Sequence, residues 1–224
     1  MLLLPKTAQF KLGESMHKQK ICWINEIPWL KMKHFLVNRE LLLRFLTHLQ
    51  NSFAATAEIY LIGQTLRLME KWVHLIEEIE FAANVSQQNR TEFEDCVADF
   101  RRENQIKIVE ESPEEVIPLP EGYHSRRREV STTDVFPDGK LKIYHFDPYS
   151  VAFRYIARGD EQDYHLVLNF LEHGWIAEEE MTAMLDKLVP RFSFQTIHQD
   201  PAEFRRRYKG LLQMWHSVEG RNQT

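Results

Sequence analysis

The sequence has little of what marks a secreted, membrane-spanning or zinc-rich protein. Its 224 residues include only two cysteines, Cys22 and Cys96, too few for a disulfide framework or a multi-cysteine zinc site. No apolar run approaches the roughly 20 residues that cross a bilayer. The opening MLLLPK is too short for the apolar core of a signal peptide. We therefore expect a cytoplasmic protein that makes no membrane contact.

Positive charge is not in excess either. Lysine and arginine number 28 against 33 acidic residues, for a net charge of −5, which argues against broad, sequence-independent nucleic-acid binding. Two basic runs, Arg126–Arg128 and Arg205–Arg207, are candidate RNA or phosphate contacts, or else a solvated loop and a solvated helix face. Apolar residues make up 43% of the chain, which is enough for one good core.

The stretch Ile59–Phe81, IYLIGQTLRLMEKWVHLIEEIEF, admits two interpretations. If its end is a strand, Glu78 and Glu80 share one face about 7 Å apart, because side chains alternate along a strand. Two carboxylates at that spacing suit a hard cation beside a phosphate. The helical spacing of the apolar residues instead predicts one amphipathic helix over Gln64–Ala83, with both glutamates facing water.

The order of apolar strand, Gly63, helix and acid-apolar-acid triplet resembles the signature of the nucleotidyltransferase superfamily. More narrowly, the chain resembles a bacterial branch related to the abortive-infection toxin nucleotidyltransferases. The likeness runs from about Val37 to Val218 and includes IPLPEGYHSRR, YHFDPYSVAFRYIARGDEQDYH and DPAEFRRRY. It implies an α+β fold: a small mixed β-sheet with flanking helices and a C-terminal helical region.

The resemblance also implies a site. The expected catalytic carboxylates are Glu78, Glu80 and, from a later strand, Glu110. The first two would be the metal ligands for Mg²⁺. The expected nucleotide-binding residues are Gly63, Gln64, Thr65, Arg154, Arg158 and Asp163. Two of these assignments have simpler alternatives: Glu110 would belong to an acidic loop, and Arg158 would pair with Asp163 between adjacent helices.

The sequence departs from the family pattern at the expected chemistry. It has Gly63-Gln64 where such families carry Gly-Gly or Gly-Ser, and Glu78-Ile79-Glu80 where they carry Asp-apolar-Asp. The extra methylene of glutamate shifts its carboxylate by over an ångström, roughly one bond length, and octahedral Mg²⁺ tolerates such shifts badly.

Along the chain, residues 1–31 lie outside the resemblance and show no lasting period, so we expect a poorly ordered extension. Residues 32–146 are the expected nucleotidyltransferase-like core, and residues 147–224 a helical region packed on it. Expected strands are 59–62, 78–81, 105–109, 130–136 and 141–146, the last two joined by a turn at 137–140. Expected helices run from an Asn38 cap to about Ser52, from a Thr91–Glu94 capping box to about Glu103, and over 148–158, 160–172, 177–188 and 201–218.

Three functions remain open from the sequence. The first is an active Mg²⁺-dependent nucleotidyltransferase of toxin–antitoxin type that modifies RNA or protein using a nucleoside triphosphate. The second is a degenerate form of the fold that binds a nucleotide or phosphate ligand with little or no transfer, beside an antitoxin-like partner. The third is a structural interaction protein whose glutamates are surface residues. The departures at both motif positions favour the second.

Overall fold

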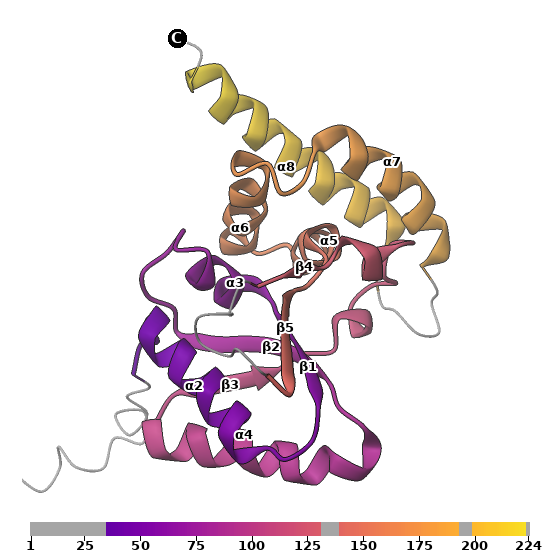
Figure 1. The fold of residues 1–224 in the computed structure, drawn as a ribbon. Coiled ribbons are helices and arrows are strands. Elements are labelled where there is room, and N and C mark those ends of the chain that lie inside the picture. Colours follow the sequence, from indigo (N-terminus) through magenta and orange to yellow (C-terminus); the bar gives the residue numbers. More distant parts are fainter. Residues whose placement is uncertain (1–34, 131–138, 193–198, 223–224) are drawn as a thin grey trace, which may run out of the picture. The chain divides into compact units, whose positions relative to one another are not determined.

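The computed structural model describes residues 35–130, 139–192 and 199–222 (Figure 1). The expected N-terminal extension at 1–31 lies outside these residues. So does most of the expected strand at 130–136, together with the first half of its turn. Within the described ranges, no helix has both the length and the apolar character needed to span a bilayer.

A five-stranded mixed sheet forms the centre of the fold, in the order β3-β2-β1-β5-β4. Its strands are β1 (Ala57–Leu61), β2 (Glu78–Asn84), β3 (Lys107–Glu110), β4 (Arg128–Glu129) and β5 (Leu141–His145). Strand β1 pairs antiparallel with β2 and parallel with β5, while β2 pairs parallel with β3 and β4 pairs antiparallel with β5. The expectation of an α+β fold with a small mixed sheet is confirmed.

The acidic stretch is a strand, so the prediction of one helix over Gln64–Ala83 is wrong. Helix α3 (Gly63–Met69) is short. Lys71 adopts a left-handed φ of 64°, which a continuing right-handed helix cannot contain. The chain then extends, and Ile76 forms an isolated antiparallel bridge with Val37 before β2 begins.

The other helices lie close to their predicted ranges. They are α2 (Arg39–Ser52), α4 (Arg90–Asn104), α5 (Pro148–Arg158), α6 (Glu161–Glu172), α7 (Glu178–Leu188) and α8 (Pro201–Asn222). The 3₁₀ helices are η2 (Gln87–Asn89), η3 (Pro113–Glu115), η4 (Tyr123–Arg126) and η5 (Val189–Arg191).

Local capping explains where two of these helices begin, and a third begins earlier than predicted. Asn38 accepts a hydrogen bond from the Leu41 N–H at 2.8 Å, as its type predicts. Asp147 caps α5 just before Pro148. The predicted N-cap at Thr91 is wrong, because η2 runs directly into α4 and places Thr91 inside the first turn.

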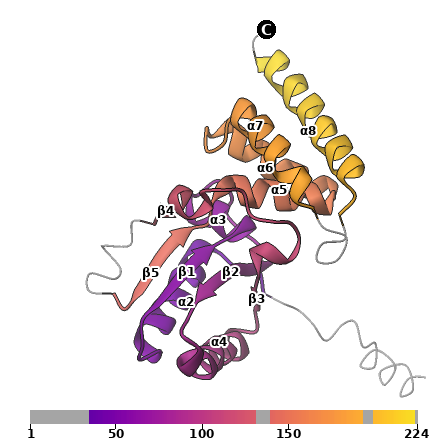
Figure 2. The same cartoon turned by 90° about the vertical axis from the view of Figure 1, so that its right-hand side faces the viewer.

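The two faces of the sheet belong to two cores. On one face, β1 and β2 direct Ile59, Leu61, Ile79 and Phe81 into an apolar cluster that includes Phe45 of α2 and Phe93 of α4. Figures 1 and 2 show α2 and α4 together on one side of the sheet and α5–α8 grouped away from them. The other face carries Glu80 and Ala82 of β2, and it meets α5.

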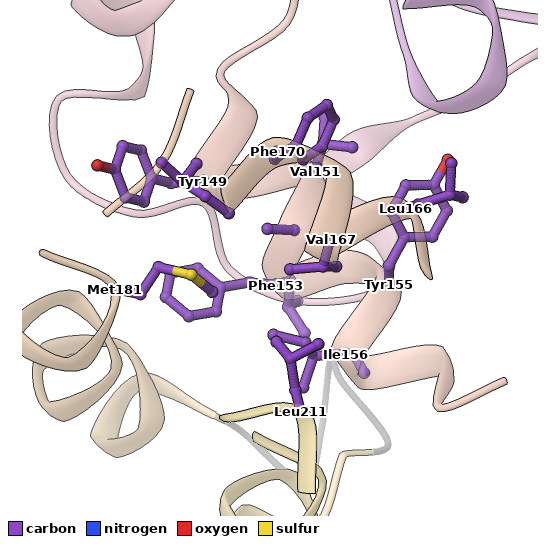
Figure 3. Close-up of a cluster of buried hydrophobic side chains, with 14 of the residues drawn as sticks. Tyr149, Val151, Phe153, Tyr155, Ile156, Leu166, Val167, Phe170, Met181 and Leu211 are labelled. Atoms are coloured by element: carbon purple, nitrogen blue, oxygen red, sulfur yellow. The ribbon is translucent and has the colours of Figure 1, made fainter. Parts of the chain in front are cut away.

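Helix α5 is the centre of the second core. Every residue from Pro148 to Ala157 is buried, which is unusual for a helix and means that neighbours surround it. Figure 3 shows side chains of α6, α7 and α8 packed around those of α5, among them Phe170, Met181 and Leu211. The same cluster contains Ile62 and Ala82 from the sheet side. The C-terminal helices and the sheet therefore share one core through α5.

Candidate functional site

The carboxylate of Glu80 lies in the turn between β1 and α3. Its Oε atom accepts a hydrogen bond from the backbone N–H of Gln64 at 3.1 Å. The backbone N–H of Glu80 in turn donates to the Thr65 hydroxyl at 2.7 Å. These two bonds join residues 15 and 16 positions apart in the sequence, and only 7% of Glu80 is exposed to solvent. Gln64 and Thr65, both expected to hold a nucleotide, are thus partners of Glu80.

Gly63 is required by this close packing. Its φ of +57° is in the left-handed region. A Cβ atom at this position would lie 1.9 Å from the hydroxyl oxygen of Tyr155 and 2.3 Å from the carboxylate of Glu80. Any larger residue would therefore collide with two buried polar groups, and the turn is filled by side chains of the protein itself.

Burial controls the protonation of Glu80. Desolvation raises its pKa from 4.5 to about 7, against the lowering effect of the Gln64 hydrogen bond. Repulsion by Glu78 and Glu111 raises the pKa further, and Arg158 lowers it. Burial also raises the pKa of the neighbouring Tyr155 hydroxyl well above its usual range. Burial in this turn therefore favours the protonated form of Glu80.

A pocket of about 220 Å³ opens beside Glu80. It collects five of the residues that the sequence singled out as site residues: Gln64, Glu78, Glu80, Arg158 and Asp163. Tyr155 and Gln162 also line it, and sequence reasoning did not find them. The strand places Glu78 and Glu80 on the same face, as the period-two interpretation predicts.

No protein-family model matches the chain, and no curated protein or solved structure matches it. The function is therefore inferred from the contacts, charges and burial of the residues around Glu80.

Glu78 is not free to act with Glu80, because it forms an ion pair with Lys107 of the neighbouring strand. The two residues lie side by side in the β2–β3 register. About 27% of the Glu78 side chain and 53% of the Lys107 side chain are exposed, and of the two only Glu78 lines the pocket.

Arg158 and Asp163 form an ion pair with each other, which is the simpler of the two alternatives that the sequence left open. The Nε atom of Arg158 lies 3.1 Å from the Asp163 carboxylate. Burial raises the pKa of Asp163 from 3.8 to about 6, although Arg158 lowers it. The pair joins the end of α5 to the first turn of α6, and its guanidinium also lies over the Tyr155 ring.

Glu110 lies on the opposite face of the sheet from Glu80. It is in register with Phe81 and forms an ion pair with Arg90 of α4, so it takes no part in this site. The acid that does act on the pKa of Glu80 is Glu111, the residue directly after this strand. Alternation along the strand could have identified Glu111. Val109 pairs with Glu80, and Glu111, two residues after Val109, faces the same side of the sheet.

Arg154 is also committed to a partner inside the protein. It is 8% exposed, forms an ion pair with Glu111 and donates a hydrogen bond to the Ser112 carbonyl at 3.3 Å. This pair ties the buried centre of α5 to the end of β3. A phosphate would have to displace Glu111 to reach this guanidinium.

Magnesium, which the resemblance implies, does not fit this arrangement of acids. In the part of the chain that the structure describes, no group of three or more His, Cys, Asp or Glu side chains could hold a metal ion. Glu80 accepts the Gln64 N–H and Glu78 pairs with Lys107. A cation at these acids would therefore compete with both contacts and with the proton of Glu80.

The two basic runs are likewise taken up by internal contacts. In the loop run, Arg126 binds both oxygens of Asp147 at 2.9 and 2.8 Å, and the other two guanidinium groups lie over aromatic rings: Arg127 over Tyr144 and Arg128 over Trp175. In α8, Arg205 pairs with Asp186, Arg206 pairs with Glu203, and Arg207 pairs with Glu203 and the Ala157 carbonyl. Each of the six arginines therefore has a partner within the protein, although Arg206 is 78% exposed and pairs only within its own helix.

Proposed function

We propose that this protein is a nucleotidyltransferase-like protein that binds a nucleotide ligand but does not transfer the nucleotide. The main support for the absence of transfer is that the Glu80 carboxylate occupies the turn after β1, where it accepts a hydrogen bond from the Gln64 N–H at 3.1 Å. In the enzymes that the sequence resembles, this turn faces the triphosphate and the acidic strand holds Mg²⁺. Here one of the acids fills the turn.

The length of glutamate supports this proposal. The extra methylene lets the carboxylate fold back onto the Gly63–Thr65 turn, which a shorter aspartate would not reach as readily. With its pKa near 7, Glu80 holds a proton that a metal ion must displace at neutral pH. Four acids line the pocket beside it against one basic residue, Arg158, so without a metal ion this pocket does not favour the phosphates of a nucleotide, which then bind elsewhere. The same features that stabilise the closed turn therefore oppose transfer chemistry.

An active Mg²⁺-dependent enzyme is the second candidate, and one observation favours it. Besides burial, the charges of Glu78 and Glu111 both raise the pKa of Glu80, so two further acids lie close enough to repel its ionised form. A divalent cation would relieve that repulsion if the Glu80 side chain rotated out of the turn. In this form, Glu111 would have to leave its ion pair with Arg154 before it could supply the third carboxylate in place of Glu110.

A paired binding and transfer assay tests the proposal. The full chain is titrated with each nucleoside triphosphate, with and without Mg²⁺, while melting temperature is recorded, and is then incubated with labelled nucleotide and RNA or protein acceptors. We expect a saturable rise in melting temperature that does not require Mg²⁺, and no label on any acceptor. Mg²⁺-dependent transfer that disappears in Glu80→Gln would overturn the proposal.

The double variant Glu78→Asp with Glu80→Asp provides the matched comparison. It restores the Asp-apolar-Asp pattern and shortens both side chains by one methylene. If side-chain length is what excludes the metal, this variant should gain Mg²⁺-dependent stabilisation that the wild-type chain lacks. Equal responses to Mg²⁺ in both proteins would show that length is not the cause.

A further inference from the structure

A second and larger pocket lies on the same face of the sheet, past Ala82. Its volume is about 350 Å³, within the roughly 300–1,000 Å³ range of small-molecule sites. Its floor comes from Tyr60 of β1 and Ala82–Asn84 of β2, and its wall from the segment between β3 and β4. The small side chain of Ala82, flanked by large aromatic residues, leaves this part of the sheet hollow.

Aromatic rings from three separate parts of the chain converge on this pocket. Tyr60 comes from β1, Phe146 from the end of β5, and Tyr123 from η4. The Tyr60 and Phe146 rings meet edge to face at 5.8 Å, and the Tyr123 ring lies 6.0 Å from Phe146. Such an arrangement offers ring faces and edges for a planar ligand.

The Tyr60 ring is held in place before any ligand arrives. Its hydroxyl donates to Glu58 at 2.8 Å and accepts from Arg127 at 2.9 Å, while its ring stacks on Tyr144 at 5.6 Å. The Tyr60 hydrogen bond is the main reason that the pKa of Glu58 is lowered, so the acid stays ionised and keeps the network intact. A ring fixed in this way loses little conformational entropy when a ligand stacks against it.

Charge in the pocket is largely compensated by the protein. Both oxygens of Asp147 bind Arg126, and Arg127 lies 3.4 Å from Glu58. Asn84 and His124 add hydrogen-bonding groups to the lining, which also includes the exposed Glu114. A neutral planar molecule with polar edges suits such a lining better than a highly charged phosphate chain does.

We infer that this pocket binds a nucleobase, and that the base rather than the phosphates is the part of the nucleotide that the protein recognises. This inference rests on the proposed function, because it places the ligand of that function away from the filled turn at Gly63. The base can come from a free nucleoside or nucleotide, or from single-stranded RNA, since the rings that recognise it are the same. Affinity should then depend little on the number of phosphates and on Mg²⁺.

The test is a calorimetric titration of the full chain with adenosine, guanosine, cytidine and uridine, with the mono- and triphosphate of the best of them, and with a short single-stranded RNA. Removing a stacked aromatic residue costs about 1–3 kcal/mol per base, which is roughly a 5- to 150-fold loss of affinity. We therefore expect Tyr123→Ala to weaken binding at least fivefold. Tyr123→Phe should bind within about twofold of wild type, because the ring remains.

Tyr164→Ala is the matched control. Tyr164 is also half-buried, but it lies on α6 and does not line the pocket. Its removal should leave the affinity unchanged. If Tyr123→Ala does not fold, photolabelling of the wild-type chain with 8-azidoadenosine replaces it. The label is then expected on residues that line the pocket, which lie at position 60 and within 82–84, 113–127 and 146–147.

The outcomes separate this inference from the function on which it rests. Nucleoside binding that Tyr123→Ala weakens supports both, and preference for the RNA or for the free nucleotide identifies the source of the base. Triphosphate binding with no nucleoside binding, or with unchanged affinity in a folded Tyr123→Ala, overturns the base site and leaves the proposed function standing. Label found mainly on residues that do not line this pocket does the same. Failure of every nucleoside, nucleotide and RNA to bind at millimolar concentration overturns both.

Discussion

Replacing Glu80 by glutamine should stabilise the protein, and the gain should grow as the pH rises. Glu80 is 7% exposed, and burial raises its pKa from 4.5 to about 7. Glutamine has nearly the same shape and keeps an oxygen that can accept the Gln64 N–H. The substitution therefore removes the ionisation while leaving the hydrogen bond of the turn in place.

The size of the effect follows from the change in pKa. Each unit corresponds to about 1.4 kcal/mol, so a pKa of about 7 in place of 4.5 amounts to about 3 kcal/mol once the carboxylate is fully ionised. For a domain of about 150–250 residues, 1 kcal/mol changes the melting temperature by about 2–4 °C. The melting temperature of the variant, minus that of wild type, should therefore be about 6–12 °C larger at pH 8.5 than at pH 4.

The sign of the pH dependence is fixed by the direction of the pKa change. The folded protein holds the Glu80 proton more tightly than the unfolded chain does, so the folded state binds more protons between pH 4.5 and about 7. The free energy of unfolding therefore falls as the pH rises through that window. Asp163, whose pKa burial raises to about 6, adds to this fall in both proteins. The difference between wild type and Glu80→Gln isolates the Glu80 contribution.

Thermal melts of both proteins at half-unit steps from pH 4 to pH 8.5 measure this difference. Any pH-independent cost of burying the amide cancels when the difference is compared across pH. Glu77→Gln is the matched control, since Glu77 precedes the same strand but is exposed. A difference between wild type and Glu80→Gln that stays constant from pH 4 to pH 8.5 would refute the electrostatic reasoning.

Three further predictions concern the fold around the site. Gly63→Ala should destabilise the protein by more than about 2 kcal/mol in urea unfolding, because it adds a clash with Tyr155 to the cost of a left-handed φ. Gly174→Ala is the control, since Gly174 has a φ of +66° but an added Cβ there meets nothing within 4 Å, and it should cost only about 1 kcal/mol. Equal losses of stability in the two variants would exclude the clash. Asp147→Ala should cost about 3 kcal/mol by the same measurement, since it removes the α5 cap and the partner of a largely buried arginine; a loss below 1 kcal/mol would contradict the buried pairing. Expressed alone, residues 147–224 should show no cooperative melt by circular dichroism, because α5 loses the sheet that buries one side of it; a sharp transition would instead show an independent domain.

The sequence alone was enough to locate most of the elements, because the signals for them are local. Alternation along Ile79–Phe81 and β-sheet propensity identify β2, and Asn38 and Asp147 mark helix starts through bonds to backbone groups two or three residues away. The placement of Glu78 and Glu80 on one face also follows from period two alone. The Thr91 cap was misplaced because η2 adds a turn that no local signal announced.

Tertiary structure alone decided what the site residues do. Whether the Glu80 carboxylate points into the turn or toward a metal depends on a backbone N–H that lies 16 positions away in the sequence and on Tyr155, 75 positions later. The β2–β3 register decides that Glu111, and not Glu110, faces the side of Glu80. Arg154 is paired with Glu111, which lies 43 positions away in the sequence. Burial then sets the pKa of Glu80, since desolvation comes from atoms of several elements at once. A sequence pattern specifies which residues share a face, whereas side-chain direction, pairing and charge state are set by the residues packed around them.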